Sequence, residues 1–132
     1  MQNMWEKIVF LCALAATACL FRGNGGEIVS ATGGREAIER ALDTNIEIAK
    51  CEGHTPRKSV MDGVRERMTD PNGTWTSSMQ RDIEAGNPVE ADHIVGFMLD
   101  KARKHKLDDT ILSLAYTHLK TYEARRAFHR LP

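Results

Sequence analysis

The chain has 132 residues, enough for one domain with its own core and too few for a second. Lysine plus arginine and aspartate plus glutamate each number 18, so no overall charge favours a nucleic acid or an anionic membrane as a partner. Aromatic residues make up 6% of the chain, and glycines and prolines lie between apolar periodic segments, which favours helices over a sheet.

The first apolar segment, after Lys7, allows two interpretations. A positive charge, an apolar run of about fourteen residues and small residues at 16–18 form the pattern of a cleavable secretory signal. Trp5 and Glu6 do not suit the basic start of a signal, and an almost uniformly apolar helix is what the centre of an all-helical domain requires. The run is also shorter than the roughly 18 residues that indicate a membrane-spanning helix. We therefore expect a buried central helix over residues 3–22.

About five further helices follow from the spacing of apolar residues. The glycine-rich segment 22–26 is expected to be a turn and not a nucleotide loop, because it lacks the GxGxxG spacing and follows a helical pattern. Helices are then expected over 35–52 and 57–69, from Ser77 to Gly86, from Asn87 to about 106, and from Asp108 or Asp109 onward, with a frayed tail at 127–132. Short connections between them predict a compact, all-α, multi-helix domain.

Neither the cysteines nor the histidines predict a cofactor site. Cys12, Cys19 and Cys51 include no CxxC pair, and their odd number argues against a disulfide framework. We expect free, buried thiols in a cytosolic protein. The five histidines show no HExxH or paired ligand spacing, so no metal site is expected.

The segment between residues 76 and 92 carries several helix-boundary signals. Ser77 lies three residues before Gln80, which is the spacing of a capping box. Gly86 suits a helix C-terminus, and Asn87 and Glu90 fall at N-cap and N3 positions for the next helix. These residues predict a tight corner between two helices.

The same segment resembles the signature of the C-terminal domain of ketopantoate reductases (2-dehydropantoate 2-reductases). The resemblance rests on Ser77-Ser78-Met79, Asp82-Ile83-Glu84-Ala85-Gly86, Pro88 and Glu90-Ala91-Asp92-His93-Ile94. Trp5-Glu6-Lys7-Ile8-Val9 is similar to the opening of the same domain, where a tryptophan precedes the catalytic lysine by two. The resemblance covers residues 5–126 and implies a fold like the C-terminal domains of ketopantoate and 6-phosphogluconate dehydrogenases.

The resemblance also implies a reaction. In this family a Rossmann domain binds NADPH, the helical domain closes over it, and hydride transfer to 2-dehydropantoate gives pantoate for pantothenate biosynthesis. The resemblance places the general acid at Lys7 and substrate contacts at Ser78 and Glu90. A lysine can deliver a proton and stabilise a developing alkoxide. From the sequence alone, Lys7 is either partly desolvated, as an acid would be, or a lysine that reaches solvent at a helix end.

Two departures from the family pattern affect the expected activity. Leu11 and Ala15 stand where the family has asparagines, so the substrate is a more apolar 2-oxo acid or the reaction has been lost. The sequence also has no strand-rich half and no dinucleotide fingerprint. We therefore expect a domain cut from, or encoded apart from, a longer cytoplasmic reductase. It should be inactive without its Rossmann partner and should self-associate as a homo-oligomer, such as a dimer, through the uncovered face.

Two other hypotheses stay open at this point. The domain could be a non-catalytic helical dimerisation or adaptor module derived from the family, which the missing asparagines favour and the retained Lys7, Ser78 and Glu90 oppose. The third is a small exported helical protein, anchored or cleaved near Cys19.

Overall fold

The computed structural model describes residues 1–131, and every regular element in that range is helical. The elements are α1 (Gln2–Phe21), α2 (Gly25–Ser30), α3 (Gly34–Cys51), α4 (Lys58–Met68), α5 (Ser78–Ala85), η1 (Asp92–Gly96), α6 (Phe97–Lys104) and α7 (Thr110–Ala127). Element η1 is a turn of π-helix that runs directly into α6. Residues 1–131 form no strand, so the predicted all-α class is confirmed.

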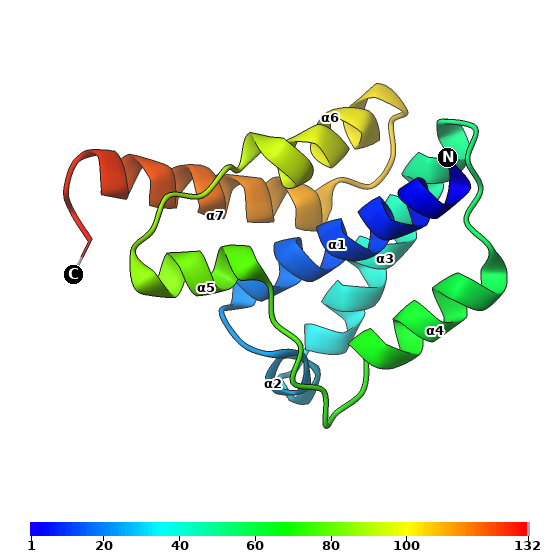
Figure 1. Ribbon diagram of the computed structural model, residues 1–132, viewed down its shortest axis with the longest axis horizontal. Helices are drawn as coiled ribbons and strands as arrows, with labels where there is room; N and C mark the ends of the chain where they lie inside the picture. The colour runs from blue at the N-terminus through cyan, green and yellow to red at the C-terminus, as the bar shows by residue number, and fades with distance from the viewer. Residues whose placement is uncertain (132) are drawn as a thin grey trace.

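Helix α1 crosses the middle of the molecule, with α3 and α7 as its most extensive neighbours (Figure 1). Its inward-facing residues are small or of moderate size, and Val9, Cys12, Ala16 and Cys19 are fully buried. Such residues let neighbouring backbones approach closely on several sides. The predicted buried central helix is therefore confirmed. With a mean hydropathy of 1.7, α1 also meets the length and composition criteria for a membrane span, as buried core helices often do.

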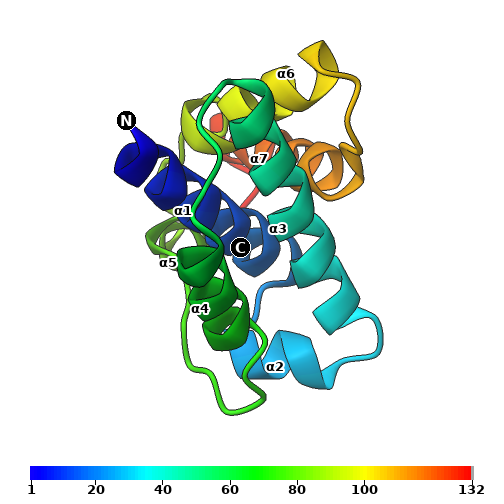
Figure 2. The ribbon, with the colours of Figure 1, turned by 90° about the vertical axis from the view of Figure 1, so that its right-hand side faces the viewer.

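Large side chains from the surrounding helices fill the rest of the core. Ile38, Leu42 and Ile48 come from α3, while Leu112 and Leu119 come from α7, and all are almost completely buried. Burial of each such side chain stabilises the fold by about 1.5–3 kcal/mol. Figure 2 shows α4 beside α3, and α2 and α6 at opposite ends of the molecule.

Several predicted helix boundaries are confirmed. Helices α3 and α4 begin and end within one residue of the predicted ranges. Ser77 is the N-cap of α5, and its Oγ accepts a hydrogen bond from the backbone N–H of Gln80 at 3.0 Å. Gly86 ends α5 with φ at 76°, in the left-handed region that favours glycine.

The predicted turn after α1 is wrong in its second half, which forms helix α2. Oδ1 of Asn24 accepts the N–H of Glu27 at 2.9 Å, and Oε1 of Glu27 accepts the N–H of Asn24 at 2.8 Å, which completes a capping box. Gly25 is needed for packing, because a Cβ there would lie 2.0 Å from Nε1 of Trp75. The glycines of this segment therefore let other residues pack closely against the backbone, besides letting the chain change direction.

The predicted helix start at Asn87 is also wrong, because the chain stays non-helical as far as Glu90. Helix α7 provides the physical reason. Tyr122 Oη donates to the carbonyl oxygen of Asn87 at 2.7 Å, and Glu123 Oε2 accepts the backbone N–H of Ala91 at 3.1 Å. These contacts hold the segment extended along α7 and delay the helix start to η1.

All three cysteines are free, but only two are buried. Burial raises the pKa of the Cys12 thiol to about 12 and that of Cys19 to about 11. The prediction of a third buried thiol is wrong, since Cys51 is exposed at the last residue of α3.

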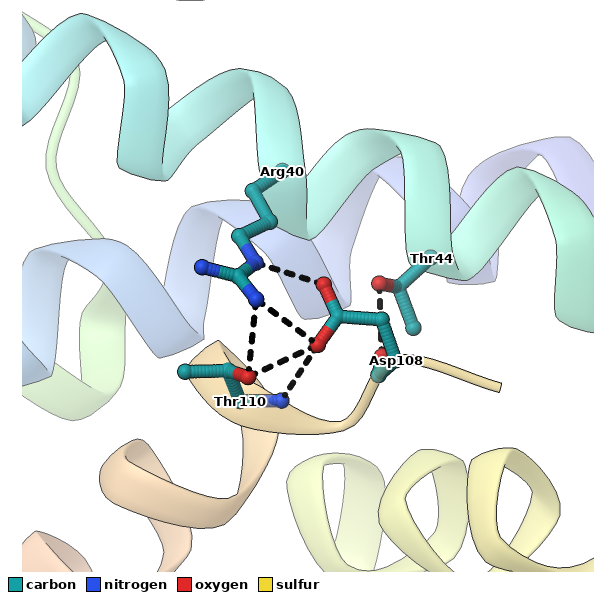
Figure 3. A network of polar contacts seen from close by, with 4 residues as sticks. All are labelled: Arg40, Thr44, Asp108 and Thr110. Carbon is teal, nitrogen blue, oxygen red and sulfur yellow. Dashed lines mark hydrogen bonds and ion pairs between the residues drawn. The ribbon is translucent and has the colours of Figure 1, made fainter. Parts of the chain in front are cut away.

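The connection between α6 and α7 is fastened to α3 by Asp108 (Figure 3). Arg40 donates to the Asp108 carboxylate through Nε at 2.5 Å and Nη2 at 3.2 Å, and Thr44 Oγ1 donates to the Asp108 carbonyl oxygen at 2.8 Å. The same carboxylate accepts the backbone N–H of Thr110 at 3.1 Å, which caps α7. Asp109 occupies the N-cap position without a capping bond. The hydrogen bond from Arg40 lowers the pKa of Asp108 to about 2.

At the C-terminal end, where we expect fraying, the chain turns back. The backbone N–H of Arg130 donates to the carbonyl oxygen of Arg125 at 2.8 Å. Leu131 is partly buried and packs against the core.

Candidate functional site

Lys7 lies near the N-terminal end of α1, on the face turned to solvent. Met4 and Leu11 are exposed on the same face, which continues along the helix in steps of three to four residues. Within residues 1–131, no hydrogen bond or ion pair engages the Lys7 ammonium group. Of the two interpretations, the structure supports the exposed lysine over the desolvated one in this domain.

The backbone around Lys7 is held by its neighbours in the sequence. The Glu6 side chain is 5% exposed, and its carboxylate accepts hydrogen bonds from the Arg57 backbone N–H at 2.7 Å, Nε at 3.1 Å and Nη2 at 2.7 Å. The Arg57 hydrogen bonds lower the pKa of Glu6. Trp5 stacks on His54, with ring centroids 5.9 Å apart. These contacts fix the first turns of α1 to the residues that precede α4.

The two serines at the start of α5 have different environments. Ser77 is buried, caps the helix and lies with its Oγ 3.8 Å from Sγ of Cys19 on α1. Ser78 follows in the first turn of α5 and is exposed. The capping function thus falls to Ser77, and the hydroxyl of Ser78 faces solvent.

Glu90 lies at the end of the extended segment before η1, and its side chain is 82% exposed. Its carboxylate is 3.9 Å from Nδ1 of His93, which is a long contact for an ion pair. A shallow hollow of about 380 Å³ adjoins it and is lined by Val89, Glu90, Asp92, His93 and Glu123. Glu90 therefore presents a largely unengaged carboxylate beside a surface depression.

Side chains from α7 surround the residues that follow Glu90. Tyr116 Oη donates to Asp92 Oδ1 at 2.5 Å, and Lys120 Nζ lies 2.8 Å from Glu123 Oε1 and 3.6 Å from Asp92 Oδ2. The Tyr116 hydrogen bond lowers the pKa of Asp92, and Asp92 raises the pKa of Tyr116. Sequence reasoning missed Tyr116 and Lys120. The sequence offered one signal for them: Tyr116, Lys120 and Glu123 are spaced four and three residues apart, which places them on one face of a helix.

The structure places the three candidate residues on one core helix and on two elements that touch it. Lys7 is on α1, Ser78 on α5 and Glu90 beside η1, and both α5 and η1 pack against α1. Within the described residues, no hydrogen bond or ion pair joins any two of the three side chains, and neither Lys7 nor Ser78 lines the hollow at Glu90. The arrangement offers an ammonium, a hydroxyl and a carboxylate at the surface, without a closed cavity around them.

The face of α1 beyond Lys7 is apolar. Leu11, one turn further on, is 39% exposed, and Ala15, two turns further on, is buried. A ligand that reaches Lys7 would therefore meet an exposed leucine on its next contact along α1.

The described residues hold no evident metal or dinucleotide site. Across residues 1–131, no group of three or more His, Cys, Asp or Glu side chains is arranged to hold a metal ion. The same range contains no strand, and hence no βαβ unit of the kind that binds a dinucleotide.

Comparison with known proteins identifies relatives that match most of the chain. The family profile described as "Ketopantoate reductase PanE/ApbA C terminal" matches residues 1–123. An uncharacterized oxidoreductase of Bacillus subtilis, YkpB, is 29% identical over 125 residues, which cover 95% of this chain and 41% of that protein. A 2-dehydropantoate 2-reductase of Halobacterium salinarum is 26% identical over 104 residues, which cover 79% of this chain and 34% of that protein. The chain thus spans well under half the length of these relatives.

Solved structures show the same fold. A ketopantoate reductase from Ralstonia eutropha matches with a TM-score of 0.80 at 19% identity, over 95% of this chain and 42% of that one. A dimeric ketopantoate reductase from Staphylococcus aureus matches with a TM-score of 0.79 at 23% identity, over 95% and 43%. Since the family profile covers nearly all of the sequence, this chain belongs to the ketopantoate reductase family and forms its C-terminal helical domain.

Proposed function

We propose that this chain is the substrate-binding domain of an oxidoreductase that reduces a 2-oxo acid to a 2-hydroxy acid. Besides the family membership, one observation supports this. Each candidate residue is exposed, while the residue beside it in the sequence is buried: Glu6 beside Lys7, Ser77 beside Ser78, and Ala91 beside Glu90. The buried neighbours carry the structural contacts, so the exposed residues are available to a ligand.

In the proposed reaction, Lys7 acts as the general acid. Its ammonium donates a hydrogen bond, and then a proton, to the oxygen of the substrate carbonyl as that carbon is reduced. The positive charge also stabilises the developing alkoxide. Ser78 and Glu90 orient the substrate: the Ser78 hydroxyl donates a hydrogen bond to a substrate oxygen, and the Glu90 carboxylate accepts one from a hydroxyl. Such orientation holds the carbonyl where Lys7 reaches its oxygen.

We infer that NADPH supplies the hydride and is held by a separate Rossmann domain. The described residues of this chain do not fit a dinucleotide, because they form no strand and no glycine-rich strand-to-helix turn. The relatives are more than twice as long as this chain, which leaves room in them for such a domain. We propose the N-terminal Rossmann half of a longer, cytoplasmic reductase as the partner of the helical domain, which spans about residues 5–126.

The proposed substrate is 2-dehydropantoate or a related 2-oxo acid, which places the reaction in or near pantothenate biosynthesis. Leu11 decides between polar and apolar substrates in this proposal. An exposed leucine one turn from Lys7 favours a 2-oxo acid with an apolar side chain, because burying that side chain against Leu11 removes apolar surface from water.

An assay with two arms tests the proposed function. The chain alone is expected to oxidise no NADPH with any 2-oxo acid. Joined to the Rossmann half of a relative such as YkpB, it is expected to oxidise NADPH when a 2-oxo acid is added. Failure of the joined protein to reduce any 2-oxo acid, despite binding NADPH, would contradict the proposed function.

A second candidate function is a non-catalytic dimerisation or adaptor module. The observation that favours it is the exposed apolar surface near the N-terminal end of α1, which includes Met4, Leu11 and Phe97. We expect the isolated chain to form homo-oligomers, visible as a sedimentation coefficient that rises with protein concentration. A monomer at every concentration would contradict self-association through this surface.

A further inference from the structure

We propose that Tyr116, Lys120 and Glu123 of α7 are positioning residues for Glu90, which fix the backbone around it so that its carboxylate meets the substrate. The inference rests on the proposed function, in which Glu90 contacts the 2-oxo acid. None of the three α7 residues needs to touch the substrate. They act on Glu90 through the two residues that follow it, Ala91 and Asp92.

The segment before Glu90 is fixed to α7 at its start. Tyr122 Oη donates to the carbonyl oxygen of Asn87 at 2.7 Å, and Arg126 Nε donates to the carbonyl oxygen of Gly86 at 3.0 Å. The backbone N–H of Asn87 also bonds to the Asp82 carbonyl oxygen at 2.8 Å, in the last turn of α5. The chain therefore leaves α5 along a defined path.

The segment after Glu90 is fixed to α7 by a denser set of contacts. Glu123 accepts the backbone N–H of Ala91 at 3.1 Å, and Tyr116 donates to the Asp92 carboxylate at 2.5 Å. Lys120 lies between the two carboxylates, 2.8 Å from Glu123 and 3.6 Å from Asp92. One cation shared by two acids restrains both, so the two residues that follow Glu90 are held together.

The late helix start also frees Glu90 from a capping role. With an N-cap at Asn87, Glu90 would stand at N3, where a glutamate accepts the backbone N–H of the N-cap residue. Here the Asn87 N–H bonds to the Asp82 carbonyl oxygen instead, and the N-cap of η1 is Ala91, whose N–H bonds to Glu123, 32 residues away. Glu90 is thereby left without a structural bond other than its 3.9 Å contact with His93. A free carboxylate on a clamped backbone is what a substrate contact requires.

The π-helical turn that follows packs against the same tyrosine. The backbone N–H of Gly96 bonds to the carbonyl oxygen of Ala91 at 2.9 Å, which is the i to i+5 bond of a π-helix. A Cβ on Gly96 would lie 3.1 Å from Cε1 of Tyr116 and 3.2 Å from Oδ1 of Asp92. The ring of Tyr116 therefore packs closely against the turn at Gly96, and its hydroxyl holds the Asp92 carboxylate. Single π-helical turns occur frequently at functional sites.

A double-mutant cycle in the reductase formed with a Rossmann half tests the inference. Glu123→Ala is expected to raise the KM for the 2-oxo acid about tenfold, with a smaller effect on kcat, because Glu90 loses its position. In a Glu90→Ala background the same change is expected to alter KM less than about twofold. Equal increases in both backgrounds would overturn the inference, because a purely structural role does not depend on Glu90.

Two further variants separate positioning from loss of fold. Tyr116→Phe keeps the ring against Gly96 and removes only the hydroxyl, so it is expected to raise KM without unfolding the domain. Thr121→Ala on the same helix is the matched control, since the Thr121 hydroxyl donates to the carbonyl oxygen of Thr117 in its own helix, and the KM of this variant should stay unchanged. A Tyr116→Phe enzyme with an unchanged KM would count against the inference.

Amide hydrogen exchange, measured on this chain alone, tests the inference without an activity assay. Glu123→Ala is expected to speed exchange of the Ala91 amide at least about tenfold while amides of α3 keep their protection. Unchanged exchange at Ala91 would overturn the inference. If the unsubstituted reductase reduces no 2-oxo acid, the proposed function fails and the inference with it. If that enzyme is active and the cycle shows no coupling, only the inference fails.

Discussion

The chain changes direction at two glycine-marked corners that are stabilised in different ways. At the first, between α1 and α3, Asn24 and Glu27 cap the short helix α2 for each other, three residues apart. At the second, between α5 and α6, the capping contacts come from Tyr122 and Glu123, more than thirty residues away. The first corner closes on itself, while the second depends on α7.

The difference has a consequence for the surface of each corner. At the first corner, the side chains of Asn24 and Glu27 are already engaged, because each accepts a hydrogen bond from the backbone N–H of the other. At the second corner α7 supplies the backbone contacts, so Glu90 stays exposed and largely unengaged. A corner stabilised from a distance can thus present a polar side chain to a ligand on an ordered backbone.

The largest effect is expected from a substitution that obstructs the first corner. A Cβ on Gly34 would lie 1.7 Å from the carbonyl oxygen of Ile28, so Gly34→Ala forces α2 and α3 apart. We expect a loss of roughly 3 kcal/mol or more in the free energy of unfolding, measured by urea denaturation. Unchanged stability would show that the corner does not need this close approach.

Gly63→Ala is the matched control for that experiment. Gly63 lies within α4, and no atom within 4 Å would meet an added Cβ. The change is expected to stabilise the protein by about 0.5–1 kcal/mol, because alanine favours a helix more than glycine does. The two Gly→Ala variants should therefore move stability in opposite directions.

An intermediate effect is expected when the contacts from α7 to the second corner are removed. The double variant Tyr122→Phe with Glu123→Ala loses the bonds to Asn87 and Ala91, each worth roughly 1 kcal/mol. Local capping by Asn87 and Pro88 should then move the helix start towards Asn87. Backbone chemical shifts of residues 87–91 check this, and shifts that stay non-helical would contradict the role given to α7.

These corners also show how far the sequence alone could predict the structure. The long helices, the Ser77 cap and the Gly86 stop were predictable because their signals lie within a few residues. Helix α2 was missed although its capping box is equally local, because its glycines indicate a turn. The start of α6 was not, because Asn87 and Glu90 are outcompeted by side chains of a helix whose position only the fold reveals. The Glu6–Arg57 bond, between residues 51 apart, was hidden for the same reason.

For the candidate site, motif resemblance singled out Lys7, Ser78 and Glu90, and their roles stay predictions. Burial then separated each one from its structural neighbour, and for Ser77 this agrees with the capping role predicted from the sequence. The sequence left the exposure of Lys7 open, because periodicity does not tell which face of an almost uniformly apolar helix is left uncovered.

The smallest effect is expected at the connection between α6 and α7, which combines local and distant contacts through Asp108. Its folded-state pKa is about 2, below the roughly 3.9 of an unfolded chain, so its contacts stabilise the fold above about pH 4 and are lost as the pH falls towards 2. Because the side chain is 42% exposed, we expect only about 0.5–1 kcal/mol. Asp108→Asn should therefore be less stable at pH 6 and nearly equal to the unsubstituted protein at pH 2. A stability difference that persists at pH 2 would contradict the ionic origin.

The central claim is that Lys7 delivers the proton in a 2-oxo acid reductase, and kcat/KM of the joined enzyme after Lys7→Ala tests it most directly. The control is Lys58→Ala, which removes an exposed helical lysine that pairs with Asp62 on α4. We predict a loss of about 10²–10⁴-fold in kcat/KM for Lys7→Ala and no loss for Lys58→Ala. Normal turnover after Lys7→Ala would contradict the claim.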